Sequence, residues 1–140
     1  MYILDTNIFL RALIREDEKM LSDCVRLLDG LERKKFKAKL PGMVLAEIVW
    51  MLQLHYRFPK DTITSFMRHL LSMSHLFIIN DYRHFLALSL FTKHNIKYVD
   101  CCIASLPGVL EGKHTIVSYD KEFDRLGVKR VEPGTIVAKL

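Results

Sequence analysis

The sequence contains few cysteines, and these are not spaced for a structural framework. Cys24 stands alone and Cys101 directly precedes Cys102, whereas a disulfide scaffold or a four-ligand zinc site needs more thiols at regular spacing. The histidines supply no zinc-binding pattern either. We therefore expect reduced, buried thiols of the kind found in cytosolic proteins, in a fold held together by its apolar core.

Long apolar runs are also missing. The most apolar segment, Met43 to Leu54, is interrupted by Glu47 and Gln53, and it is shorter than the roughly 20 apolar residues that a membrane helix needs. The first residues, Met1 to Asp5, lack the basic start, apolar stretch and small-residue cleavage site of a signal peptide. We expect a soluble protein of the cytoplasm that makes no contact with a membrane.

An acidic excess is absent. The 140 residues include 21 Lys and Arg against 16 Asp and Glu, for a net charge of +5. This balance favours polyanionic partners, but only weakly when taken alone. Five cations crowd one segment: Arg33, Lys34, Lys35, Lys37 and Lys39. For this segment a solvated helix end, where cations suit the helix dipole, is favoured over a role in substrate binding.

Short apolar strands alternate with helices along the chain, without repeats or linkers. Strands are expected at residues 2–4, 37–40, 76–79, 115–118 and 128–131. Helices are expected after residue 5, over 18–33 and 43–56, from 61 or 62, from 80 or 81 to about 94, and over 99–106, with a short one at 121–126. The alternation indicates βαβ units in one domain, residues 1–140. The expected fold class is α/β, a three-layer sandwich with a short, mainly parallel central sheet flanked by helices.

Several helix boundaries have local signals. Asp61 or Thr62 is expected to cap the helix that follows Pro59, and Asn80 or Asp81 the next one. Pro107-Gly108 should break the helix that contains residues 99–106, and Pro133-Gly134 should begin a tail. In a parallel sheet the ligand crevice lies at the carboxyl ends of the strands, so polar residues there are the candidates for function.

Four carboxylates stand where a charge is either functional or costly. Asp5 follows the first strand and Asp120 the fourth, while Glu47 and Asp100 lie in apolar helical segments. An unpaired buried carboxylate is unfavourable, and clustered carboxylates raise one another's pKa. Bound Mg²⁺ or Mn²⁺ relieves both costs and keeps positions open for water and phosphate. Each acid alone has an ordinary explanation as a cap, turn residue or arginine partner, so only the set of four indicates a metal site.

Four segments, in order, resemble the motifs of PIN domains. Residues 3–10 look like the opening motif, an apolar strand followed by Asp-Thr-Asn. Residues 44–48 are similar to the second motif, whose glutamate lies on a helix, and residues 98–104 to the third, an aspartate that opens an apolar helix. Residues 116–123 resemble the fourth, where a strand runs into Ser/Thr-x-Asp-x-Asp/Glu-Phe. The resemblance covers essentially the whole chain.

The resemblance implies a metal-dependent endoribonuclease that hydrolyses RNA phosphodiester bonds with Mg²⁺ or Mn²⁺. The expected catalytic residues and metal ligands match the acidic quartet of the family: Asp5, Glu47, Asp100 and Asp120. In this mechanism the metal activates water, and no nucleophilic side chain is required.

The resemblance also implies supporting residues. Thr6 and Asn7 match polar positions that hold Asp5 or the water around the metal, and Ser118 matches a hydroxyl beside the fourth acid. Asp124 is either an additional acid near the site or the partner in a surface salt bridge. Residues that grip the substrate are not assigned, although proximity to the motifs makes a few cations candidates: Arg11, Arg15, Lys97 and Lys121.

The compact size is most similar to the toxin subunits of toxin–antitoxin pairs, the VapC-like group. This implies a homodimer and a cognate antitoxin that blocks the acidic pocket. Two features depart from the family pattern. Pro107-Gly108 interrupts the helix after Asp100, and Cys101-Cys102 is an unusual vicinal pair that we interpret as core packing.

Two other functions stay open. A PIN-fold RNA-binding or scaffold module would bind without cutting, although such a module has no need of an intact quartet. A phosphatase similar to haloacid dehalogenases also begins with a strand followed by an aspartate. That chemistry needs a second aspartate two positions later, where this chain has Asn7. Phosphate-loop and dinucleotide-binding folds are excluded, because no glycine-rich turn follows the first strand.

Overall fold

A five-stranded, fully parallel sheet forms the centre of the computed structural model, which describes residues 1–140. The strand order is β3-β2-β1-β4-β5. The strands are β1 (Tyr2–Leu4), β2 (Ala38–Pro41), β3 (Leu76–Ile79), β4 (Thr115–Val117) and β5 (Arg130–Val131). In register, Ile3 pairs with Lys39 on one side and with Ile116 on the other. The predicted α/β class is therefore confirmed, with every strand pair parallel.

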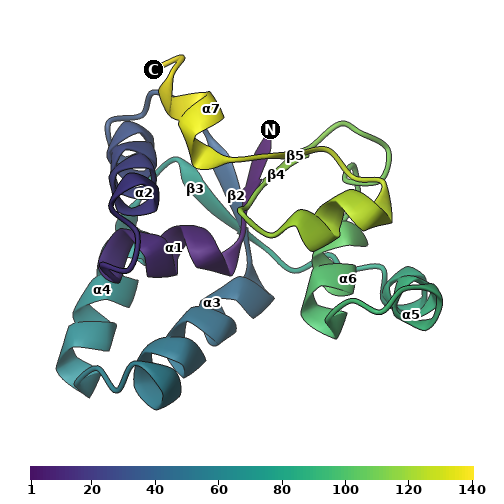
Figure 1. Ribbon diagram of the computed structural model, residues 1–140, viewed down its shortest axis with the longest axis horizontal. Coiled ribbons are helices and arrows are strands. Elements are labelled where there is room, and N and C mark those ends of the chain that lie inside the picture. Colours follow the sequence, from purple (N-terminus) through teal and green to yellow (C-terminus); the bar gives the residue numbers. More distant parts are fainter.

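Helices cover both faces of this sheet. They are α1 (Thr6–Leu13), α2 (Glu18–Glu32), α3 (Gly42–Trp50), α4 (Lys60–Ser72), α5 (His84–Lys93), α6 (Tyr98–Ala104) and α7 (Pro133–Val137). A π-helical turn, η1 (Met51–His55), extends α3, and a 3₁₀ helix, η2 (Lys121–Leu126), follows β4. Figure 1 shows α1, α2 and α4 on the left of the sheet and α5, α6 and η2 on its right. None of these helices is long and apolar enough to cross a membrane.

The strand order places a crevice beside β1. The chain adds β2 and β3 on one side of β1 and then returns to add β4 and β5 on the other. Connections therefore diverge between the carboxyl ends of β1 and β4, which is where ligands bind in open parallel sheets. Ile3 and Leu4 are fully buried, as expected for a central strand covered on both faces. The cysteines are free and buried in the core, as predicted.

Helix α3 differs from its prediction. One continuous, largely buried helix over residues 43–56 was expected, but α-helical bonding ends at Trp50 and gives way to η1. Within α3 only Val44 and Ile48 are buried, and Trp50 is 56% exposed. The segment is apolar nearly all round, yet this chain covers only one side of it. Apolar side chains of α3 and η1 consequently face outward.

Prolines begin two helices that the sequence places differently. Pro59 precedes the first turn of α4, no side chain caps that helix, and the predicted cap at Asp61 or Thr62 is wrong. Pro133 occupies the first turn of α7, where its fixed φ suits a helix, so the expected tail is helical. The far end of α7 is buried, and this packing holds the segment against α2.

The segment before α5 is extended rather than helical. Asn80 or Asp81 was expected to cap this helix, but α5 begins only at residue 84 and has no side-chain cap. The Tyr82 hydroxyl accepts a hydrogen bond from the Met43 backbone at 2.9 Å. Arg83 donates to a carbonyl beyond α6. These two tertiary contacts hold the segment away from helical geometry, which local capping signals could not reveal.

Arg83 also explains how the chain accommodates Pro107-Gly108. Helix α6 ends before this pair, as predicted. The Arg83 guanidinium donates to the carbonyl of Ser105 at 2.7 Å and to Glu111 at 2.7 Å. Glu111 accepts from the backbone of Gly108 at 2.9 Å, whose φ of 87° favours glycine. The hydrogen bond from Arg83 lowers the pKa of Glu111 to about 2.

Candidate active site

Asp5 lies where β1 ends and α1 begins, and the fold holds its carboxylate on both oxygens. Its backbone N–H donates to the carbonyl of Val117 at 3.2 Å, which aligns it with the end of β4. Oδ1 accepts from the Thr6 backbone at 2.8 Å and thereby caps α1. Oδ2 accepts from the Asn7 amide at 2.8 Å and from the Ser118 hydroxyl at 2.7 Å. The Asp5 side chain is therefore fixed in direction.

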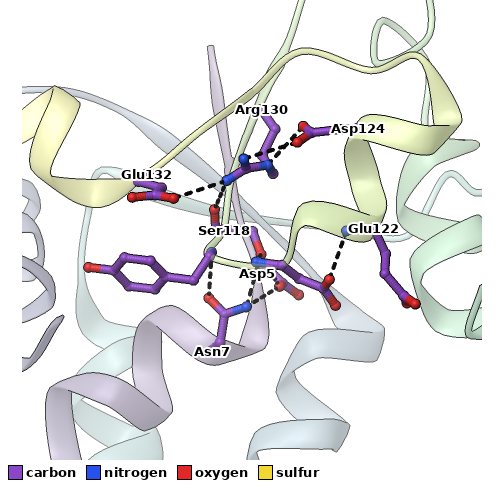
Figure 2. A network of polar contacts seen from close by, with 9 residues as sticks. Asp5, Asn7, Ser118, Glu122, Asp124, Arg130 and Glu132 are labelled. Carbon is purple, nitrogen blue, oxygen red and sulfur yellow. Dashed lines mark hydrogen bonds and ion pairs between the residues drawn. The ribbon is translucent and has the colours of Figure 1, made fainter. Parts of the chain in front are cut away.

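Ser118 and Asn7 connect Asp5 to Asp120. The Ser118 hydroxyl accepts from the Asn7 amide and from the Asp120 backbone, each at 2.9 Å. The Asn7 carbonyl oxygen accepts from the Tyr119 backbone at 3.3 Å. Figure 2 shows the Asn7 side chain reaching from the first turn of α1 to Asp5 and Ser118. Asn7 and Ser118 thus both contact the Asp5 carboxylate, whereas the buried Thr6 hydroxyl has no hydrogen-bond partner.

Asp100 opens helix α6 and is 3% exposed. Its Oδ2 is buried and accepts no hydrogen bond, and the nearest cation is the Lys97 ammonium at 3.9 Å. Burial raises the pKa of Asp100 to about 7; Lys97 opposes this shift, and the negative charges of Asp5, Asp120 and Glu47 add to it. The four acids of the sequence prediction therefore influence one another electrostatically.

The pKa of Asp5 is raised as well, to about 6. Burial is the main cause, and the hydrogen bonds from Ser118 and Thr6 oppose it. For Lys97, burial lowers the pKa, but four surrounding carboxylates outweigh burial and the pKa is raised overall. The ammonium is thus a permanent cation at an acidic site.

A group of three acids with ligand spacing lies at the carboxyl end of β4. One carboxylate oxygen each from Asp100, Asp120 and Glu122 lies within 4.8 Å of the others. Asp120 also accepts from the Glu122 backbone at 2.9 Å, which fixes the start of η2. Glu122 was not among the residues predicted from the sequence. The signal was present, because the fourth motif has a second acid two positions after Asp120.

A cleft of about 370 Å³ brings most of the predicted site together. It is lined by Asp5, Thr6, Asn7, Leu10, Glu47, Trp50, Met51, Lys97 and Asp120. Glu47 reaches it from α3, on the side across from β4. A larger groove between α4 and the α3–η1 segment has no acidic lining residue, so the smaller cleft is the candidate site.

The donors at this cleft fit a divalent cation of the Mg²⁺ or Mn²⁺ kind. The side chains that converge there offer carboxylate oxygens, the ligands that these hard cations prefer. The buried Oδ2 of Asp100 lacks a hydrogen bond, and a buried charged oxygen without a partner is strongly unfavourable. A cation at this position would supply the missing partner and offset the repulsion among the acids.

Asp124 lies outside this group of acids. Its carboxylate accepts from Arg130 at 2.9 and 3.1 Å, and this hydrogen bonding lowers its pKa. Arg130 in turn donates to the Ser118 carbonyl at 2.8 Å and lies near Glu132 (Figure 2). Of the two roles that the sequence allows, the structure shows the salt bridge.

Among the candidate substrate-gripping cations, Lys97 alone lines the cleft. Arg11 pairs with Glu16, and Arg15 lies 3.4 Å from Glu18. The basic segment at residues 33–39 joins the end of α2 to β2. It therefore lies toward the amino ends of the strands, at the opposite edge of the sheet from the acids.

The fold and the site define a class: a parallel α/β domain with an acidic, metal-suited cleft where the strand order reverses. The model of the PIN domain family matches residues 2–129. This chain belongs to the PIN domain family.

Individual relatives agree with this assignment. The chain is 28% identical over 135 residues to a VapC ribonuclease of Aquifex aeolicus (strain VF5), which covers 95% of this chain and 97% of that protein. VapBC2 from Rickettsia felis, solved with a DNA fragment from its promoter, matches with a TM-score of 0.64 and 22% identity, over 94% of this chain and 97% of that one. VapC20 of Mycobacterium tuberculosis, described as a Sarcin-Ricin loop cleaving toxin, matches with a TM-score of 0.70 and 14% identity, over 94% of this chain and 98% of that one. At these sequence identities the two structures show a shared fold and nothing more.

Proposed function

We propose that this chain is a metal-dependent endoribonuclease and the toxin subunit of a VapC-type toxin–antitoxin pair, acting in the cytoplasm as one domain of residues 1–140. The observation that carries the proposal is a cleft lined by Asp5, Glu47 and Asp120 in a PIN-family chain, where Asp120 also belongs to the acid group with Asp100 and Glu122. The VapC ribonuclease similar to this chain supports RNA as the substrate.

The side chains divide the work in this proposal. Asp5, Asp100 and Asp120 are the direct ligands of Mg²⁺ or Mn²⁺, and Glu122 joins them because its carboxylate lies with Asp100 and Asp120. When bound, the cation lowers the pKa of a water molecule and neutralises charge on the scissile phosphate. Glu47, from α3, binds the metal or orients the attacking water.

Neighbouring residues prepare this arrangement. Asn7 and Ser118 keep Oδ2 of Asp5 in one orientation. The Lys97 ammonium lies 3.9 Å from Asp100 and lines the cleft, where it offers a cation to an RNA phosphate. Such fixed charges stabilise a developing negative charge without reorganisation during the reaction.

Cleavage of RNA tests the proposal. Purified chain is mixed with single-stranded and structured RNA in Mg²⁺, Mn²⁺ or EDTA, and Asp5→Asn is compared with Asp124→Asn. Asp5→Asn keeps the shape but removes a ligand charge, so cleavage should fall by at least about a hundredfold. Asp124→Asn, outside the acid group, should remain active. Full activity of Asp5→Asn, or cleavage in EDTA, would remove the basis of the proposal.

We further infer two protein partners, a second copy of this chain and a cognate antitoxin. Helix α5 presents Phe85, Leu88 and Phe91, which are 91%, 52% and 47% exposed. Their spacing puts them on one face of the helix, and an exposed apolar patch on a folded domain is typical of a protein interface. This face supports a homodimer. The antitoxin is inferred from the similarity to VapC proteins, and its binding would cover the acidic cleft.

A further inference from the structure

One large aromatic side chain stands at the acidic cleft without an aromatic partner. Trp50 is the only tryptophan of the chain. It is the last residue of α3, is 56% exposed, and lines the same cleft as Asp5 and Asp120. None of the aromatic pairs of this structure includes it. Tryptophan is buried on average more than most residues, so this position needs an explanation.

The helix geometry directs Trp50 toward the chemistry. Glu47 and Trp50 are three residues apart in α3 and therefore share a face. At the next residue the helix changes to the π form, which the Tyr56 N–H closes by donating to the Met51 carbonyl at 3.0 Å. Met51 then lines the cleft together with Trp50. Trp50 and Met51 therefore lie where the α-helical and π-helical geometries meet.

The cleft is lined by side chains of two chemical kinds. Asp5, Glu47, Lys97 and Asp120 are charged, while Leu10, Trp50 and Met51 are apolar. A nucleotide has the same division, with a charged phosphate beside a flat base. Aromatic side chains bind bases by stacking, and they do so with little dependence on sequence because every base has a π-face.

We propose that Trp50 stacks on an unpaired base of the RNA next to the scissile phosphate, which lies at the carboxylates. The inference rests on the proposed nuclease function and adds a substrate class, RNA with an unpaired nucleotide at the cleavage site. A regular duplex does not present the face of a base, whereas loops and single strands do. Trp50 thereby positions the strand and does not take part in the chemical step.

Binding in EDTA tests this without cleavage, since the lone tryptophan reports on its own surroundings. A short single-stranded RNA should quench Trp50 fluorescence, and the matching duplex should not. In anisotropy titrations with labelled RNA, Trp50→Ala should weaken binding about 5- to 150-fold, and Trp50→Phe should retain most of the affinity. The matched control is Leu54→Ala, because Leu54 is 58% exposed on η1 but does not line the cleft. It should change affinity by no more than about twofold.

Abasic RNA separates stacking from an indirect structural effect. Removing one base at the right position should weaken binding to the wild type as Trp50→Ala does, with no further loss when the two changes are combined. Wild-type affinity for Trp50→Ala, or RNA binding without quenching, would overturn the inference and leave metal-dependent cleavage untouched. An unchanged RNA affinity together with a dimer that dissociates in Trp50→Ala would assign this side chain to a protein partner instead. A wild type that neither binds RNA in EDTA nor cuts it with Mn²⁺ would overturn the nuclease function as well.

Discussion

Asp5 and Asp100 are buried carboxylates, and neither forms a close ion pair with a cation. Asp5 has three hydrogen-bond donors, whereas Oδ2 of Asp100 has none and faces Lys97 at 3.9 Å. A buried carboxylate with so little support favours its neutral form unless a cation binds. This difference suggests a division of roles, in which Asp5 is held in position before metal arrives and Asp100 gains most from its arrival.

Stability of the metal-free protein should fall as pH rises from about 4 to about 7. Burial raises the pKa of Asp5 to about 6 and that of Asp100 to about 7, from a usual 3.8. Between these limits Asp5 and Asp100 bind more protons in the folded chain than in the unfolded chain, so their titration favours unfolding as pH rises, by on the order of 1 kcal/mol per pH unit for each group. Glu111 and His114 act in the opposite sense because their pKa values are lowered, but most of the loss from Glu111, whose pKa is about 2, falls below this range.

Thermal unfolding in EDTA across this pH range measures the effect. The unfolding temperature should decline toward neutral pH, and Asp100→Asn should make the decline shallower because it removes one of the titrating groups. Mn²⁺ should raise the unfolding temperature of the wild type most at the upper end of the range. An unfolding temperature that rises with pH between 4 and 7 in EDTA would show that these carboxylates are not held at raised pKa values.

At the scale of elements, local signals predict the strands better than the helix starts. The strands are short apolar runs, and all five occur near their predicted positions, because a buried parallel strand needs little beyond such a run. The predicted start of α5 was wrong, because Tyr82 and Arg83 form hydrogen bonds with distant parts of the chain. Such tertiary contacts have no signature in a single sequence.

The candidate site shows the same division. Strand-end positions identified Asp5 and Asp120 because the end of a strand is readable from the sequence. The apolar neighbours of Glu47 in the sequence indicated burial, yet Glu47 is only half-buried, because this chain covers one side of α3 alone. Glu122 and Trp50 were not singled out, since their importance depends on which side chains meet at the cleft.

The contact of Arg83 with the loop after α6 should matter for the proposed metal site. Arg83→Met removes donors to two carbonyls that follow α6 and the partner of Glu111. It should reduce the free energy of unfolding by about 1 to 3 kcal/mol, and loosening α6 should weaken Mn²⁺ binding through Asp100. Urea unfolding and calorimetry measure the two effects. Arg15→Met, from an exposed pair with Glu18, is the control and should cost at most about 1 kcal/mol. Equal behaviour of the two variants would contradict this role.

The whole molecule leaves apolar surface on two sides, along α5 and along the α3–η1 segment. Helix α5 packs against α6, and α3 packs against α1 and β2; the other side of each helix carries exposed apolar side chains. The acidic cleft lies beside α3, so occupation of that surface bears directly on access to the site. The proposed antitoxin would block the cleft if it bound to this surface.

Dimerisation through α5 should be sensitive to a single charge. Phe85→Glu replaces the most exposed aromatic side chain with a carboxylate. Burying that carboxylate in an interface would be unfavourable. Light scattering after gel filtration should show a dimer for the wild type and a monomer for Phe85→Glu. Leu71→Glu on α4, where Leu71 is 56% exposed, should leave the dimer intact. A monomeric wild type, or a dimeric Phe85→Glu, would place the interface elsewhere or remove it.

The central claim is that the carboxylates of this cleft form a divalent-metal site, and calorimetric titration of the metal-free protein with Mn²⁺ tests it most directly. The wild type should bind Mn²⁺, Asp124→Asn should bind similarly, and Asp5→Asn should lose at least about tenfold in affinity. The absence of binding by the wild type, or equal binding by Asp5→Asn, would contradict the claim and make the acidic cluster structural.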